Sequence, residues 1–107
     1  MTTVICSYDE QGLCGLRLSG HSGYAEEGSD IVCAAASVLF TACVNALETV
    51  TGIEPLVTMK PRQPLSAVQL PAGFPREKRG AANAVFQTAY EGLKATAEQY
   101  PDYLQIK

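Results

Sequence analysis

The sequence lacks several features that would assign it to common functional classes. It has no CxxC pair and no His/Cys spacing typical of zinc ligands, so we expect no metal site and no cofactor bound through one. Its net charge is −3, which argues against a general polyanion-binding role but leaves room for a local basic patch. The 107 residues contain no internal repeat or low-complexity segment, and we expect a single domain over residues 1–107.

We also expect no segment that directs the protein to or across a membrane. No basic region precedes the first apolar residues, as a signal peptide would require. The longest apolar stretch is interrupted by polar side chains at Ser37, Thr41, Asn45 and Glu48, which argues against a membrane span. We therefore expect a cytoplasmic protein whose four cysteines are reduced thiols.

Local patterns that are present predict an α+β fold. Two β-forming segments around the turn at residues 9–12 predict a hairpin, in which Cys6 and Cys14 could cross-link only if the turn placed them opposite each other. Asp30 as a cap and Gly52 as a stop predict a helix between them. The predicted order is ββαββαβ, a mostly antiparallel sheet packed by two helices. The expected ranges are strands 3–8 and 13–18, helix 30–51, strands 53–59 and 65–70, helix 81–99 and strand 103–106.

One short segment combines a thiol with the single histidine of the chain. Cys33 falls in the first turn of the predicted helix, and His21 precedes it by twelve positions in a glycine-rich loop. A helix amino terminus favours an anionic sulfur, and a nearby imidazole can remove the thiol proton and later protonate a leaving amine. Unpaired amides of the same helix turn could hold an oxyanion. The alternative is that Cys33 is a core residue and His21 a solvated loop residue.

Neighbouring residues have two interpretations each. Asp30 caps the helix or orients His21 as a third catalytic residue, and the two roles are compatible. Ser37 lies on the same helix face as Cys33 and either supports the sulfur or bonds back to the Cys33 carbonyl. The loop that contains His21 is expected to contact substrate. Its candidate residues are Gly20, Gly23, Tyr24 and Gly28.

Residues 20–37, with the sequence GHSGYAEEGSDIVCAAAS, closely resemble the ribosomal-processing cysteine protease family Prp. The pattern is a Gly-His pair, a Tyr, a Gly, then Asp-Ile-Val-Cys-Ala-Ala and a Ser. Ser22 stands where the family more often has Ala. The resemblance extends over essentially the whole chain, including the closing Tyr-Pro-Asp-Tyr-Leu-Gln-Ile.

The resemblance implies a specific activity. Such proteins remove a short amino-terminal extension from a large-subunit ribosomal protein, cutting after a pair of aromatic or apolar residues. The catalytic cysteine of the family corresponds to Cys33, its histidine to His21 and its serine to Ser37. Members use no metal or cofactor and form homodimers, which would also explain a long helix that is apolar on nearly every side.

Two other functions compete with this one. The chain could be a non-enzymatic dimeric factor that binds the ribosome, with Cys33 in the core, or, less well supported, a redox-sensing thiol protein. Basic side chains in two connecting segments are expected to be solvated, or else to contact ribosomal RNA or an acidic surface. They are Lys60, Arg62, Arg76, Lys78 and Arg79.

Overall fold

The computed structural model of the protein describes residues 1–21 and 30–107. Five strands form one sheet in the order β3-β4-β2-β1-β5. Every neighbouring pair is antiparallel except β1 with β5, which is parallel. The strands are β1 Thr2–Asp9, β2 Gly12–Ser19, β3 Leu56–Lys60, β4 Leu65–Gln69 and β5 Leu104–Ile106.

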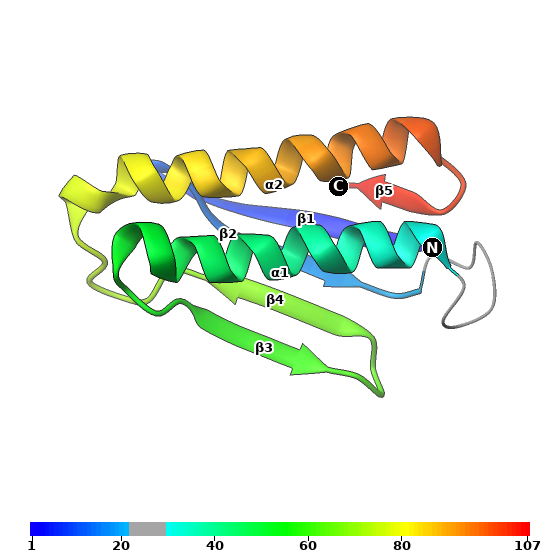
Figure 1. Cartoon of the computed structure of the whole chain (residues 1–107), viewed down its shortest axis with the longest axis horizontal. Helices are drawn as coiled ribbons and strands as arrows, with labels where there is room; N and C mark the ends of the chain where they lie inside the picture. The colour runs from blue at the N-terminus through cyan, green and yellow to red at the C-terminus, as the bar shows by residue number, and fades with distance from the viewer. Residues whose placement is uncertain (22–29) are drawn as a thin grey trace.

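Two long helices, α1 Ile31–Thr51 and α2 Arg79–Gln99, lie side by side on one face of this sheet (Figure 1). A short 3-10 helix, η1 Arg76–Lys78, leads into α2. The helices cover the middle of the sheet, whereas β3 forms the far edge beyond α1 (Figure 1). The element order is ββαββαβ, as predicted from the sequence.

The ends of α1 are fixed by the residues that predicted them. Asp30 is the N-cap, and its carboxylate Oδ1 accepts the backbone N–H of Cys33 at 2.9 Å. Gly52 ends the helix in the left-handed conformation, with φ of 75°, which a glycine adopts without strain. By length and composition α1 resembles a membrane-crossing helix, but in this fold it packs on α2 and the sheet.

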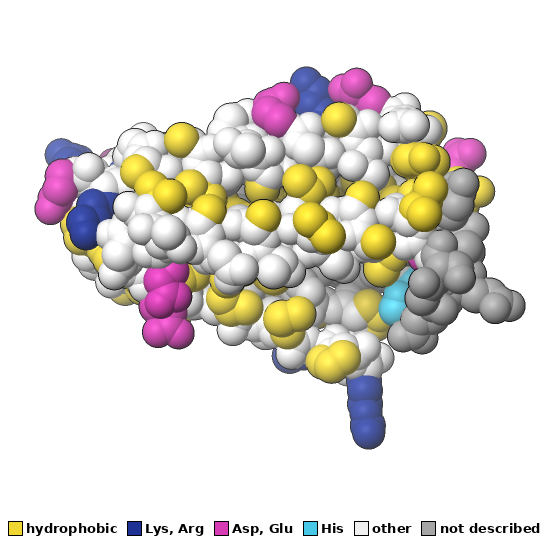
Figure 2. All heavy atoms as spheres, in the orientation of Figure 1, with side chains coloured by type: hydrophobic (Ala, Val, Ile, Leu, Met, Phe, Trp, Pro, Cys, Tyr) yellow, Lys and Arg dark blue, Asp and Glu magenta, His cyan; other side chains and the backbone are white. Residues whose placement is uncertain are grey.

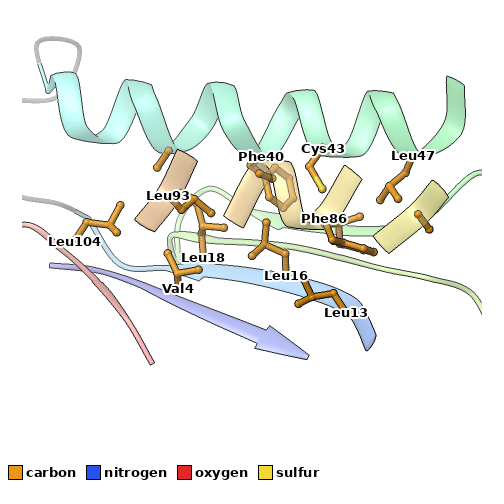
Figure 3. Packing of buried hydrophobic residues seen from close by; sticks show 14 of the residues in the cluster. Val4, Leu13, Leu16, Leu18, Phe40, Cys43, Leu47, Phe86, Leu93 and Leu104 are labelled. Carbon is orange, nitrogen blue, oxygen red and sulfur yellow. The ribbon is translucent and has the colours of Figure 1, made fainter. Parts of the chain in front are cut away.

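The core lies between the helix pair and the sheet (Figure 3). Phe40, Cys43 and Leu47 point inward from α1, and Phe86 and Leu93 do so from α2. Three leucines of β2 meet them from below, namely Leu13, Leu16 and Leu18. Leu16 and Leu18 follow the alternation of a regular strand. Leu13 faces the same side because the pairing with β1 is irregular here: Leu13 pairs with Tyr8, whereas Gly15 pairs with Ser7.

Two boundaries differ from the prediction by more than one residue. The third strand begins at Leu56 rather than at residue 53, because Gly52 turns the chain, the amide of Ile53 bonds to Thr51 Oγ1, and Pro55 has no N–H for a ladder. Helix α2 begins at Arg79, two residues before the predicted start, because η1 runs directly into it.

The prediction that the five basic side chains are solvated is wrong for Arg79, and Lys78 is half-buried. Arg79 is 6% exposed, and its guanidinium donates to both Asp9 carboxylate oxygens, at 2.6 and 2.7 Å, and to the Leu13 carbonyl at 3.2 Å. Lys78 Nζ donates to the carbonyl of Thr51 at 2.6 Å, near the carboxyl end of α1. Both charges therefore have structural partners.

Candidate active site

Cys33 is the third residue of α1 and lies half-buried at the amino-terminal end of the helix. The partial positive charge of that end favours an anionic sulfur. One of the four amides that a helix leaves unpaired at this end is already engaged, because the Asp30 carboxylate accepts from Cys33 at 2.9 Å. The next amide, that of Ala34, makes the first regular helical bond, to the Asp30 carbonyl at 3.0 Å. An oxyanion site at this helix end thus has fewer donors than its four amides suggest, and it stays a prediction.

His21 is placed by the residue before it. Gly20 has φ of 83°, and a Cβ at this position would lie 2.5 Å from the carbonyl oxygen of Met1, so that a larger residue would clash with the backbone. The amide of Gly20 also donates to the carbonyl of Pro64 at 2.9 Å. The end of β2 is thereby tied to the β3–β4 turn, which fixes the backbone from which the exposed His21 extends.

A pocket of about 130 Å³ brings these residues together. Cys33, Ser37 and Ala36 of α1 form one wall, and His21 and Gly20 form part of another. The histidine lies near the amino-terminal end of α1, at the same end of the molecule (Figure 2). The remaining lining residues are Thr2, Leu18, Phe40, Pro64, Leu65 and Ser66. A thiol at a helix terminus and an imidazole thus share one cavity, although they are twelve positions apart in sequence.

The structure also bears on the supporting residues. The capping role predicted for Asp30 is confirmed by its bond to the Cys33 amide, whereas its orientation of His21 stays a prediction. Ser37 lines the pocket with an exposed side chain. Within the described residues its hydroxyl does not bond back to the Cys33 carbonyl, unlike Thr88, whose Oγ1 donates to Ala84 at 2.8 Å. Gly23, Tyr24 and Gly28 lie outside the described residues.

The other three thiols lie in different surroundings. Cys43 is 2% exposed, and burial raises the pKa of its thiol to about 11. Burial also raises the pKa of Cys14 and of Cys6, in the second case against a smaller opposing effect of a hydrogen bond with Tyr8. All four cysteines are free thiols, so the possible Cys6–Cys14 cross-link is not formed.

Sequence reasoning missed the part of the pocket that comes from distant strands. Thr2 lies on β1, while Pro64 and Ser66 flank the start of β4. None of them belongs to a sequence motif. They reach the pocket of Cys33 because the strands that contain them pair across the sheet. Sheet register was the only signal that could have found Ser66, which pairs with Leu18 two residues before Gly20.

A cysteine and a histidine that line one pocket beside a helix terminus are the residue types that a cysteine hydrolase requires. Comparison with known proteins assigns the class. Residues 1–105 match the family described as cysteine protease Prp, and the chain therefore belongs to that family of proteases. This membership supports the protease hypothesis over the non-enzymatic binding factor and the redox sensor.

Individual relatives agree with this assignment. The ribosomal processing cysteine protease Prp of Bacillus subtilis is 27% identical over 104 residues, which are 97% of this chain and 92% of that protein. The crystal structure of an essential ribosomal processing protease Prp from S. aureus, with a covalently linked product peptide, matches with a TM-score of 0.86 and 25% identity, covering 100% of this chain and 98% of that one. A structure from Streptococcus mutans matches with a TM-score of 0.85 and 27% identity, covering 100% and 92%.

Proposed function

We propose that this cysteine protease removes a short amino-terminal extension from a large-subunit ribosomal protein, with Cys33 as nucleophile and His21 as general base and acid. The observation that carries the proposal is the shared pocket of Cys33 and His21 at the amino-terminal end of α1. Support for the substrate comes from the relatives, whose names describe ribosomal processing, and from the peptide bound to the S. aureus protease.

The proposed reaction proceeds in two stages. His21 removes the thiol proton, and the Cys33 sulfur attacks the scissile carbonyl to form a tetrahedral intermediate. The carbon–nitrogen bond then breaks as His21 passes its proton to the leaving amine, which leaves a thioester on Cys33. A water molecule, deprotonated by His21, attacks the thioester, releases the new carboxylate and restores the thiol. Ser37, exposed in the pocket, is proposed to position substrate.

A peptide that spans the predicted cut tests the proposal. We expect Cys33→Ala, Cys33→Ser and His21→Ala to abolish cleavage while keeping the circular dichroism spectrum of the wild type. The matched control is Cys43→Ala, which removes a thiol from the same helix and should still cleave. Mass spectrometry of the ribosomal protein from cells carrying Cys33→Ala should find the extension retained. Cleavage by Cys33→Ala would overturn the proposed chemistry.

The proposal includes the setting in which the enzyme works. We place it in the cytoplasm, in keeping with its four free thiols, and as a homodimer, in keeping with exposed valines such as Val38 and Val50 on α1. Of the five basic residues, Lys60, Arg62 and Arg76 remain exposed and are the candidates for contact with ribosomal RNA. Cell fractionation and analytical ultracentrifugation test the location and the oligomeric state.

A further inference from the structure

The apolar surface of β3 that faces the helix side of the sheet is not covered by either helix. Val57 pairs with Val68 of β4, and Met59 pairs with Ser66. Directly paired residues point to the same face of a sheet. Val68 is 1% exposed beneath the helices, whereas Val57 is 42% and Met59 is 64% exposed. The sheet therefore extends past α1 and presents two apolar side chains to solvent.

This surface is continuous with the Cys33 pocket. Leu18, Ser66 and Met59 form one row across three adjacent strands, because Ser66 pairs with Leu18 on one side and with Met59 on the other. Leu18 and Ser66 both line the pocket that contains Cys33. The row thus runs from the floor of the pocket to the exposed edge of the sheet. Figure 2 shows hydrophobic side chains along this side of the molecule, up to the histidine.

We infer that Met59 and Val57 form the surface that binds apolar side chains of the peptide substrate next to the scissile bond. The inference rests on the function proposed above. An extended peptide places alternate side chains on one face at a repeat of about 6.6–6.8 Å, which is also the repeat of Met59 and Val57 along their strand. Two substrate residues separated by one position can therefore contact both side chains. The flexible thioether of Met59 adapts to different apolar partners.

Continuity with the catalytic pocket favours substrate over a second copy of the chain as the occupant. A peptide whose carbonyl lies at the sulfur must leave the pocket, and the row of Ser66 and Met59 is one exit already lined with side chains of the same sheet. A partner covering Met59 would close that exit. A second copy on this surface is the competing outcome, and the experiment below separates the two.

The test compares equal substitutions on the two faces of β3. Met59→Gln preserves length and removes apolar character, and Leu56→Gln does the same at a residue that is 52% exposed and pairs with Gln69 on the opposite face. With a fluorogenic peptide spanning the cut, we expect Met59→Gln to lower kcat/KM about tenfold, mainly through KM. Val57→Thr should act in the same direction, and Leu56→Gln should change kcat/KM less than about twofold.

Further readouts separate the possible failures. Alkylation of Cys33 by iodoacetamide should proceed at the wild-type rate in Met59→Gln, since the nucleophile is unchanged. A series of peptides with glutamine at single positions should identify two positions, separated by one residue, at which the substitution lowers kcat/KM of the wild type. The same substitutions should have no further effect on kcat/KM of Met59→Gln. If the wild type cleaves none of these peptides, the proposed function fails. If the wild type cleaves them and Met59→Gln cleaves them equally well, the present inference is overturned. In that case, a sedimentation coefficient of Met59→Gln that differs from the wild type would assign the surface to contact with a second copy of the chain.

Discussion

Asp30 connects the stability of α1 with the position of the proposed nucleophile. Its Oδ1 accepts the amide of Cys33 at 2.9 Å, and the first turn of the helix itself contains no acidic residue. Asp30→Ala removes both the cap and the negative charge at the positive end of the helix. The cap is worth about 1 kcal/mol and the charge about 0.5 kcal/mol. For a chain of 107 residues, a loss of that size lowers the melting temperature by about 7 °C.

Asp30→Asn separates capping from catalysis. Asparagine caps helices about as well as aspartate, so that only the charge is lost and the melting temperature should fall by about 2 °C. If capping is the role of Asp30, kcat measured well below the melting temperature should stay within a few-fold of the wild type. If Asp30 orients His21 as a third catalytic residue, kcat should fall by about a hundredfold or more.

Thermal unfolding followed by circular dichroism at pH 7 measures the first effect, and cleavage of the peptide at 25 °C measures the second. A melting temperature for Asp30→Ala equal to that of the wild type would refute the reasoning about the cap. Equal destabilisation by Asp30→Ala and Asp30→Asn would refute the division into cap and charge. Asp30→Ser, which caps without a carboxylate, serves as the matched control and should behave like Asp30→Asn.

Three further predictions concern groups away from the pocket. The hydrogen bond from Arg79 lowers the pKa of Asp9 from 3.8 to about 2. The Asp9 carboxylate therefore binds a proton more readily in the unfolded chain than in the folded one. The stability that the ionised carboxylate gives the folded state is complete above about pH 4 and is lost as the pH falls toward 2. Urea unfolding between pH 2 and 6 should show a smaller loss on acidification for Asp9→Asn. With its pKa of about 11, Cys43 should resist iodoacetamide at pH 8 in the native protein while Cys33 reacts, which peptide mapping can check. Rapid labelling of Cys43 would contradict its burial. Phe86→Ala, at a 1% exposed residue, should cost about 3–5 kcal/mol in urea unfolding, whereas exposed Gln87→Ala should cost little. A loss below about 1 kcal/mol at Phe86 would count against the packing.

The elements that sequence predicted well have local signals at their ends. Asp30 and Gly52 bound α1 through contacts that span three or four residues, namely Asp30 with Cys33 and Gly52 with Glu48. The predicted start of β3 was too early: Ile53 is a β-forming residue, but the turn at Gly52 and the missing amide of Pro55 delay the strand to Leu56.

The parts that sequence could not predict depend on distant partners. Arg79 looked like one of several loop charges, and its burial follows from Asp9, which is 70 positions away. The thiol and imidazole of the candidate site could be named from one segment, but Pro64 and Ser66 join them only through strand pairing. Local propensity does not encode such register, because it is set by the packing of the whole sheet.

The parallel pairing of β5 with β1 has a consequence for when the enzyme becomes active. The amide of Thr2 donates to the carbonyl of Tyr103 at 2.9 Å, so that a wall of the Cys33 pocket is fastened by a segment made about a hundred residues later. We expect a nascent chain to remain catalytically incomplete until the segment that contains Tyr103 has emerged from the ribosome. A protease that trims ribosomal proteins would then be inert while the segments before Tyr103 are being made, and its first opportunity to cut would come once β5 has paired with β1.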